Sequence, residues 1–296
     1  MQDANIVNMT GENITFSILV PAYNAGATLA RTLDSLLAQT YDNWECVIVD
    51  DGSRDDTSVV AQAYCQNDLR FSCLWQENAG TASALNTAVN ASSGQFLVQL
   101  GADDELLSGY CMKTNELIKQ NPAFDIYAAN AWQVFAGGKR RLFNSGVRFE
   151  SQATLHLEDI VERPSIYGTA AIRRETFQGV GGFRPHIYNE DYDFWLRALA
   201  NGARHIYQAE TLSLYHVSPT QKTSDHLCAR KSDYELFEDL ATNGCLTDEQ
   251  IALVREKQAS IRKNIAHRTL LYRFFGKSMS EKIIAAMRSS NKKSHQ

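Results

Sequence analysis

Short apolar runs alternate with helix-like segments through the first hundred residues of this 296-residue chain, and this alternation constrains the fold more than any other feature. The runs lie at residues 16–20, 46–49, 71–75 and 96–100. The runs are mainly apolar rather than alternating between apolar and polar residues, which is typical of strands covered on both faces. Between the runs, apolar residues recur three or four positions apart, as on one face of a helix. The pattern predicts an α/β fold with a Rossmann-like, mostly parallel sheet and helices on both faces.

The second half of the chain has a less regular pattern. We expect strands at residues 125–135, 141–147 and 212–216, and short helices at residues 173–180 and 192–201. From about residue 229 the pattern is helical almost to the end, although it lacks a single clean apolar face. The sequence therefore predicts a mixed region after the regular half, followed by a helical extension.

Charge is divided unevenly along the chain. The 29 Lys and Arg residues against 34 Asp and Glu give a net charge of −5, which argues against a nucleic-acid partner. Residues 255–296, however, hold 11 basic and 2 acidic side chains. An anionic membrane attracts such a segment by about 1 kcal/mol per basic residue. The basic C-terminus therefore indicates peripheral contact with an anionic membrane; packing onto the protein body or a dimer contact is the alternative.

The sequence shows no sign of export or membrane insertion. No apolar run approaches the roughly 18 residues of a membrane span. Residues 1–13 lack a basic region followed by an apolar stretch, so no secretory signal is visible. The six cysteines include no CxxC pair, which favours reduced thiols. We therefore expect a cytoplasmic protein, peripheral on the inner membrane face if the basic segment binds lipid.

Acidic pairs follow two of the expected strands. Asp50 and Asp51 come directly after the second run, Asp103 and Asp104 follow the fourth, and residues 21–24 form a Pro/Asn turn after the first. Open parallel sheets bind ligands beyond the carboxyl ends of their strands. Carboxylates gathered there repel one another unless a cation neutralises them. Mg²⁺ or Mn²⁺, shared between one or two carboxylates and a diphosphate, is the natural partner, so the sequence predicts a metal–nucleotide site.

Helix capping is the competing role for these acids. The pairs precede helix-like segments, and Asp is common at helix N-termini, so each could be a cap. The usual glycine-rich loops GxGxxG and GxxxxGK[ST] are absent, which excludes the common dinucleotide and P-loop sites. Two acidic pairs at two strand ends favour the metal–nucleotide site over capping.

Six fragments in order resemble family 2 of the inverting glycosyltransferases, which have the GT-A fold. The resemblance runs from Ser17 to about Ser218. It rests on residues 17–24, 38–45, 49–57, 78–86, 102–104 and 181–195, which include Val49-Asp50-Asp51-Gly52-Ser53 and Glu190-Asp191-Tyr192-Asp193-Phe194-Trp195.

The resemblance implies a nucleotide site at the rim of the sheet. Its members would be Pro21, Tyr23, Asn24, Asp51, Asn78, Gly80 and Asp103. Asp51 would accept a hydrogen bond from the base, most often uracil in this family, and Asp103 would contact the ribose. Asp104 would ligate Mn²⁺ or Mg²⁺, with His216 on the metal or the diphosphate; a hydrogen-bonded edge-strand histidine is the alternative for His216.

The resemblance also implies a general base. Asp191 would take the proton of the attacking hydroxyl, and Glu190 is the alternative base. Asp193 is expected to be a structural cap, and residues 167–169 are candidates to line the acceptor cleft. One position departs from the family pattern: Gly101 stands where the metal motif often begins with an acid.

These inferences converge on a metal-dependent inverting glycosyltransferase. It would move a sugar from a nucleotide sugar, with UDP the expected nucleotide, to a hydroxyl of a glycan or lipid-linked acceptor, as in surface polysaccharide synthesis. We expect a flexible tail (1–13), a GT-A catalytic domain (14–228, with nucleotide-binding 14–105 and acceptor-binding 106–228), and a basic helical extension (229–296). The alternative is a non-catalytic nucleotide-sugar or glycan-binding subunit, motivated by Gly101. Nucleotidyl transfer is less favoured because residues 24–27 carry no cation.

Overall fold

The structure is a computed structural model that describes residues 14–144, 152–185, 187–218, 226–242 and 246–293. The chain divides into two compact units, residues 1–221 and 222–296, close to the domain boundary expected at residue 228. Each unit is described by itself below. The expected tail, residues 1–13, lies outside the described residues.

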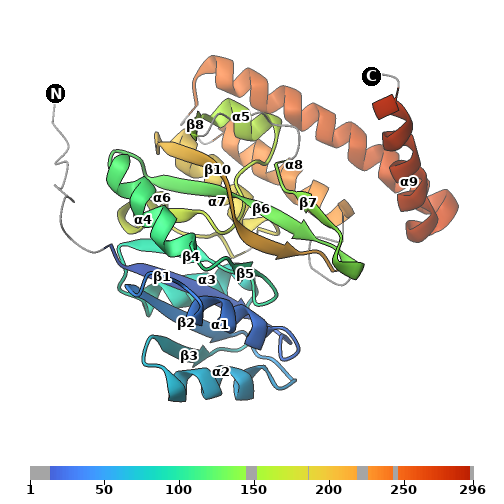
Figure 1. Ribbon diagram of the computed structural model, residues 1–296. Coiled ribbons are helices and arrows are strands. Elements are labelled where there is room, and N and C mark those ends of the chain that lie inside the picture. The colour runs from blue at the N-terminus through green and yellow to red at the C-terminus, as the bar shows by residue number, and fades with distance from the viewer. Residues whose placement is uncertain (1–13, 145–151, 186, 219–225, 243–245, 294–296) are drawn as a thin grey trace, which may run out of the picture. The chain divides into compact units, whose positions relative to one another are not determined.

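The first unit begins with alternating strands and helices (Figure 1). In chain order these are β1 (Phe16–Ala22), α1 (Leu29–Leu37), β2 (Trp44–Asp50), α2 (Thr57–Asn67), β3 (Phe71–Trp75), α3 (Thr81–Asn90) and β4 (Phe96–Gln99). The later elements are β5 (Glu105–Leu106), α4 (Tyr110–Gln120), β6 (Ile126–Val134), η1 (Ala136–Gly138), β7 (Arg140–Leu142), β8 (Gln152–Leu155), α5 (Leu157–Glu162), β9 (Ala171–Arg173), α6 (Arg174–Val180), α7 (Glu190–Ala200) and β10 (His205–His216).

Among the described residues the strands form one sheet of ten. Its main path is β3-β2-β1-β4-β9-β6-β10-β5, and β7 and β8 pair with β6 and β10. The first four strands of that path are parallel, as the sequence predicts, whereas β9 is antiparallel to both β4 and β6. The carboxyl ends of β1, β2 and β4 therefore lie at one edge, where the acidic pairs follow.

Helices cover both faces of the parallel half. Phe16, Ile18 and Val20 of β1 join Leu29 and Leu33 of α1 in one buried cluster. The intervening β1 side chains point to the opposite face, because successive residues of a strand alternate, and α3 contacts β1 and β2. Burying each large apolar side chain stabilises the fold by about 1.5–3 kcal/mol, and this is why the strands are apolar throughout.

The later half differs in detail from the prediction. The strand expected at residues 212–216 is the end of the twelve-residue β10, whose pairing with β6 shifts register twice between residues 208 and 213. The strand expected at 141–147 is the three-residue β7; residues 145–147 lie outside the described part. The unpredicted α4 buries Thr114 and Asn115, which interrupts its apolar period.

The second unit consists of α8 (His226–Thr242) and α9 (Asp248–Lys293), which pack against each other. Leu236, Phe237 and Leu240 of α8 and Val254 and Ile261 of α9 are buried. The helical extension expected from the sequence is therefore present. Over the described residues, neither helix contains a stretch apolar enough to cross a membrane.

Candidate active site

The turn after β1 is fixed by the loop after β2. The backbone N–H of Asn24 donates to Ser53 Oγ at 2.9 Å, and Asn24 Oδ1 accepts from the backbone N–H of Arg54 at 2.9 Å. Asn24 adopts φ of 50°, a left-handed conformation that Asn tolerates better than most residues. Pro21 is half-buried and Tyr23 is exposed, so the Tyr23 ring is available at this edge.

Asp51 organises the loop before α3. Its carboxylate is buried and accepts from Gln76 Nε2 at 2.7 Å and from the backbone N–H groups of Ala79 and Gly80, each at 2.9 Å. The Asn78 side chain donates to the Asp51 carbonyl at 2.9 Å. The structure thus brings together three members of the expected nucleotide set. Contact between Asp51 and a base stays a prediction.

Asp50 has a structural role. Its carboxylate accepts from the backbone N–H of Ser53 at 2.8 Å and from the hydroxyl of Ser58 in α2. Asp50 therefore serves the local loop structure, although it does not cap α2, whose N-cap residue is Asp56. This leaves Asp51 as the member of the pair that faces the α3 loop.

In the second acidic pair Asp104 is buried and Asp103 is half-buried, which disfavours their ionised forms. Asp104 is 6% exposed; its Oδ2 accepts from the Tyr167 hydroxyl at 2.6 Å, and its Oδ1 accepts from the His216 backbone N–H at 2.9 Å. Burial and the neighbouring Asp103 charge raise the pKa of Asp104 to about 8. Burial also raises the pKa of Asp103. A bound cation would favour the ionised form of both groups.

The chemistry of this pair fits a divalent metal with few protein ligands. Among the described residues, no group of three or more His, Cys, Asp or Glu side chains gathers around one point. Mg²⁺-type sites on phosphates need only one or two carboxylates, because phosphate oxygens and water complete the shell. The His216 ring is engaged elsewhere: its Nε2 lies 2.7 Å from Glu105 Oε1. Ligation by Asp104 and His216 stays a prediction.

Gly101 lies against the acidic pair. A Cβ at this position would be 3.0 Å from Asp104 Oδ2 and 3.1 Å from Asp103 Oδ1, closer than nearly all real Cβ contacts. An acid at 101 would need both carboxylates to move and would add a third charge. The departure from the family pattern is therefore matched by the local packing of Asp103 and Asp104.

Tyr167 and Gly168 connect the acidic pair to the candidate base. Tyr167 is bonded to Asp104, and the next residue, Gly168, lies beside Asp191: its Cβ position would be 3.7 Å from Asp191 Oδ2. Asp191 is half-buried at the start of α7, whereas Glu190 is buried. Asp104, the expected metal ligand, thus contacts Tyr167, and Asp191, the expected base, lies beside Gly168. Both of these neighbours belong to residues 167–169, which are expected to line the acceptor cleft.

Gln99, the last residue of β4, is a candidate site residue that the sequence analysis did not single out. Its Cδ and Nε2 lie 3.9 Å from the same Gly168 Cβ position, so its amide and Asp191 both lie beside Gly168. Its Oε1 is buried and has no hydrogen-bond partner among the described residues. Buried amides normally have one. A glutamine within the apolar run of residues 96–100 was the signal that could have identified it.

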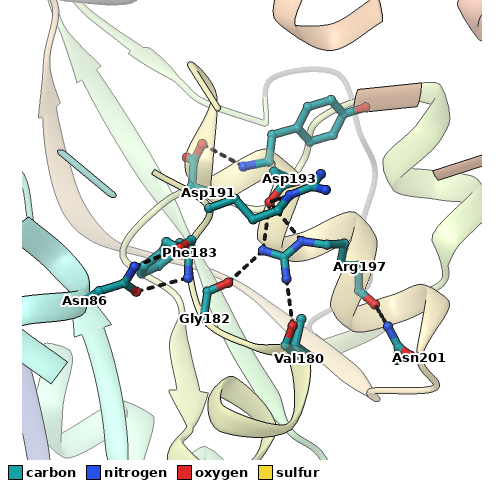
Figure 2. Close-up of polar contacts among 10 residues, drawn as sticks. Asn86, Val180, Gly182, Phe183, Asp191, Asp193, Arg197 and Asn201 are labelled. Carbon is teal, nitrogen blue, oxygen red and sulfur yellow. Dashed lines mark hydrogen bonds and ion pairs between the residues drawn. The ribbon is translucent and has the colours of Figure 1, made fainter. Parts of the chain in front are cut away.

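A buried ionic network holds α7 in place (Figure 2). Asp193 is fully buried and pairs with Arg184 and with Arg197, whose Nη2 lies 2.7 Å from Asp193 Oδ2. Arg197 also donates to the carbonyls of Val180 and Gly182, at 2.8 and 2.7 Å. The structural role expected for Asp193 is thus seen as an ion-pair network rather than a helix cap.

Asn86 of α3 links this region to the nucleotide half of the unit. Its Nδ2 donates to the Phe183 carbonyl at 2.8 Å, and its Oδ1 accepts from the Phe183 backbone N–H at 3.1 Å (Figure 2). Arg197 of α7 donates to the carbonyl of the preceding residue, Gly182, and also pairs with Asp193 in the first turn of α7. Residues 182–183 therefore connect α7 to α3. Asp191 is therefore presented from a well-supported helix.

A sheet with a parallel half covered by helices, and with carboxylates beyond its strand ends, is an architecture that binds ligands at those ends. A family model described as Glycosyl transferase family 2 matches residues 17–181. A Haemophilus influenzae protein named uncharacterized glycosyltransferase is 30% identical over 216 residues, which is 70% of this chain and 70% of that protein. The chain belongs to glycosyl transferase family 2, and it is an enzyme that transfers sugar from a nucleotide sugar.

A relative with a fuller name and two solved structures extend the comparison. Escherichia coli WfgD, a UDP-Glc:alpha-D-GlcNAc-diphosphoundecaprenol beta-1,3-glucosyltransferase, is 27% identical over 77% of this chain and 87% of its own length. S. aureus TarS 1–349 superposes with a TM-score of 0.68 at 19% identity, over 88% of this chain and 75% of that one. The mannosyltransferase PcManGT from Pyrobaculum calidifontis, in complex with GDP-Man and Mn²⁺, gives 0.59 at 16% identity, over 94% and 87%. These likenesses confirm the predicted GT-A fold.

Proposed function

We propose that this protein is a metal-dependent inverting transferase that moves a sugar from a UDP-sugar to a lipid-linked glycan acceptor. The observation that carries the proposal is that Asp104 accepts a hydrogen bond from Tyr167 while Asp191 lies beside the next residue, Gly168. WfgD, by its name, uses UDP-Glc and a diphosphoundecaprenol-linked acceptor, and a TarS structure contains UDP-GlcNAc. Both support UDP as the nucleotide, and the first supports the acceptor class.

The nucleotide half would hold the donor. Tyr23 and Asn24 would lie along the base and ribose, with Asp51 directing the α3 loop toward the base and Asp103 contacting the ribose. Asp104 would ligate Mn²⁺ or Mg²⁺ together with the diphosphate, and His216 would support that contact. When bound, such a cation neutralises charge on the leaving diphosphate as a Lewis acid.

Asp191 would act as the general base. A hydroxyl is a weak nucleophile until its proton is removed, and a positioned carboxylate accelerates such a step by about 10²–10⁴-fold. Asp191 is preferred over Glu190 because it is less buried and its Oδ2 lies beside Gly168. With one base and no second nucleophile, direct displacement inverts the anomeric carbon.

Gln99 would recognise the transferred sugar. Its Oε1 is a buried hydrogen-bond acceptor with no partner among the described residues, and its amide lies beside Gly168, as Asp191 does. The transferred ring must lie in that space if Asp104 and Asp191 have the roles above. A sugar hydroxyl would then satisfy the amide oxygen.

The first test uses UDP-Glc and a GlcNAc-diphospho-lipid, the substrate chemistry in the name of WfgD. In Asp191→Asn, transfer should fall by about 10²–10⁴-fold while UDP still stabilises the protein in a thermal-shift assay. In Asp104→Ala, stabilisation by UDP should no longer depend on Mn²⁺; for the native protein it amounts to about 2.7 kcal/mol at 100 times Kd. Asp42→Asn is the matched control, because that side chain is 96% exposed.

The contrary outcome would be full transfer activity in both Asp191→Asn and Asp104→Ala. UDP binding without turnover over a panel of donors and acceptors would instead favour a non-catalytic binding subunit. Gly101 is the feature that motivates this second candidate, because it removes one acid of the family motif.

The acceptor class also bears on location. A lipid-linked acceptor lies at a membrane, and the excess of basic residues in 255–296 suits an anionic lipid surface. The proposal therefore includes peripheral contact of the basic C-terminus with the inner membrane face, in the synthesis of a surface glycan.

A further inference from the structure

Helix α9 contains an abrupt break. Gly276 adopts φ of 72° and ψ of 161°, values far from those of a helix, and helical structure resumes directly after it. In Figure 1 the red end of α9 turns away from the longer orange part. Positive φ strains residues with a Cβ, so glycine is the residue that makes this corner possible.

Buried polar contacts hold the two arms of the corner together. Arg268, 2% exposed, forms an ion pair with Glu281 on the opposite arm, and the Tyr272 hydroxyl donates to the same carboxylate. The fully buried Ser280 hydroxyl donates to the Gly276 carbonyl at 2.7 Å. The Glu281 contacts join residues on both sides of the break, and the Ser280 contact holds the start of the second arm, so the corner is a preformed structure rather than a frayed helix end.

The corner presents large apolar side chains to solvent. Leu270, Phe274, Phe275 and Met279 are 54%, 69%, 56% and 54% exposed. Four of the ten exposed large apolar side chains in the described residues therefore lie within ten positions. Single exposed apolar residues are ordinary, but a cluster indicates an interaction surface.

The charges around this cluster are basic. Arg273, Lys277 and Lys282 are exposed in the same stretch. The acid among residues 270–282, Glu281, is already engaged by Arg268 and Tyr272. Aromatic and aliphatic side chains flanked by exposed cations form the composition of a surface that enters the headgroup region of an anionic bilayer.

We infer that residues 270–282 form a wedge that inserts into an anionic membrane. Phe274 and Phe275 enter the boundary between headgroups and acyl chains, and Arg273 and Lys277 contact lipid phosphates. This inference rests on the proposed peripheral location and deepens it, because it assigns the contact to apolar insertion at one corner rather than to diffuse charge. A rigid corner loses little conformational entropy on insertion, which makes it better suited than a disordered tail.

The test measures co-sedimentation of the full chain with phosphatidylcholine vesicles, with and without phosphatidylglycerol. The double variant Phe274→Ser/Phe275→Ser should lose roughly tenfold or more of its partitioning to the anionic vesicles, because two buried phenyl groups are removed. Val59→Ser/Leu69→Ser is the control: it removes two exposed apolar side chains, at 68% and 101% exposure, from the first unit. The control should bind as the native chain does.

A reporter variant gives a second, independent measurement. The four native tryptophans all precede residue 196, so Phe275→Trp adds one at the wedge. Its emission, taken as the difference from the native protein, should shift to the blue on addition of anionic vesicles. Salt should weaken binding of the native chain and abolish the residual binding of the double serine variant.

Three outcomes would overturn the inference: unchanged vesicle binding by the double serine variant, no shift of the new tryptophan, or a serine variant that loses a dimer in light scattering instead of lipid binding. The last would make the corner a contact between copies of this chain. UDP-induced thermal stabilisation, measured without vesicles, keeps this separate from the proposed function. If only the membrane inference is wrong, UDP will still stabilise the double serine variant. If the proposed nucleotide site is wrong, UDP will not stabilise even the native chain.

Discussion

At the residue scale, the two Asp-Asp pairs have the same sequence but different hydrogen-bond partners and burial. The Asp50 carboxylate accepts hydrogen bonds from the Ser53 backbone N–H and the Ser58 hydroxyl. The Asp51 carboxylate accepts three hydrogen bonds from the loop before α3. Asp104 also accepts two hydrogen bonds, yet burial and the Asp103 charge raise its pKa to about 8. Burial therefore disfavours the ionised forms of Asp103 and Asp104, and a cation beside them would favour those forms.

Gln99 gives a residue-scale prediction about the donor sugar. UDP-Glc and UDP-GlcNAc share a nucleotide, so any affinity difference between either donor and UDP alone reports on the sugar. Gln99→Met keeps the volume but removes the buried acceptor, and it should remove about 1–3 kcal/mol of that difference because the sugar hydroxyl then lacks a partner. Isothermal titration with UDP and both UDP-sugars measures it.

The matched control for Gln99 is Gln178→Met, on the exposed face of α6. It should leave the affinity for all three ligands unchanged. Equal losses for UDP and for the UDP-sugars in Gln99→Met would point to a structural role and would remove Gln99 from the sugar site.

At the element scale, sequence predicted the strands best where both faces are covered. β1 to β4 lie within two residues of their expected positions, because continuous apolar runs have few alternative structures. Helix α4 was not predicted because the buried Thr114 and Asn115 interrupt the spacing of its apolar residues. The length of β10 was underestimated because two register shifts divide the strand into dissimilar halves. In the site, the residues of the Asp51 loop could be predicted because they belong to a recognisable motif. Gln99 could not, because its neighbour Gly168 is distant in sequence.

The placement of α7 leads to a prediction at this scale. Asn86→Ala would leave both backbone groups of the buried Phe183 without their side-chain partner, and this should lower the free energy of unfolding by about 1–3 kcal/mol. Because the same loop supports the start of α7, kcat should fall while the affinity for UDP is retained. Urea unfolding, followed by tryptophan fluorescence, and steady-state transfer assays measure the two effects.

Asn67→Ala is the comparison for Asn86. Its side chain is exposed and donates to Ala63 within its own helix, at 2.7 Å, so its loss should cost a few tenths of a kcal/mol and leave kcat unchanged. If Asn86→Ala weakened UDP binding as much as it lowered kcat, the residue would belong to the nucleotide site rather than to the support of α7.

At the scale of the whole first unit, one buried histidine connects stability to pH. His205 begins β10 and pairs with Ile126 of β6 and Leu155 of β8. It is fully buried, and neither ring nitrogen has a hydrogen-bond partner among the described residues. Burial lowers the pKa of His205 to about 3. The imidazole therefore stays neutral in the folded protein at every pH where this enzyme is expected to work.

The direction of the pH effect follows from proton binding. The unfolded chain binds a proton at His205 below about pH 6.5, whereas the folded chain binds it only below about pH 3, so stability is lost as pH falls between these values. The slope contributed by this one proton is at most about 1.4 kcal/mol per pH unit. His205→Leu should flatten the dependence of the free energy of unfolding on pH between about 6 and about 4.

Urea unfolding followed by tryptophan fluorescence reports on this unit, because every tryptophan lies in residues 1–221. His156→Asn removes an exposed imidazole while keeping a side chain suited to the N-terminus of α5, so it should leave the slope as in the native protein. An unchanged slope in His205→Leu would mean that β10 opens to water before the unit unfolds, and that the β6–β10 pairing is the weak point of the sheet.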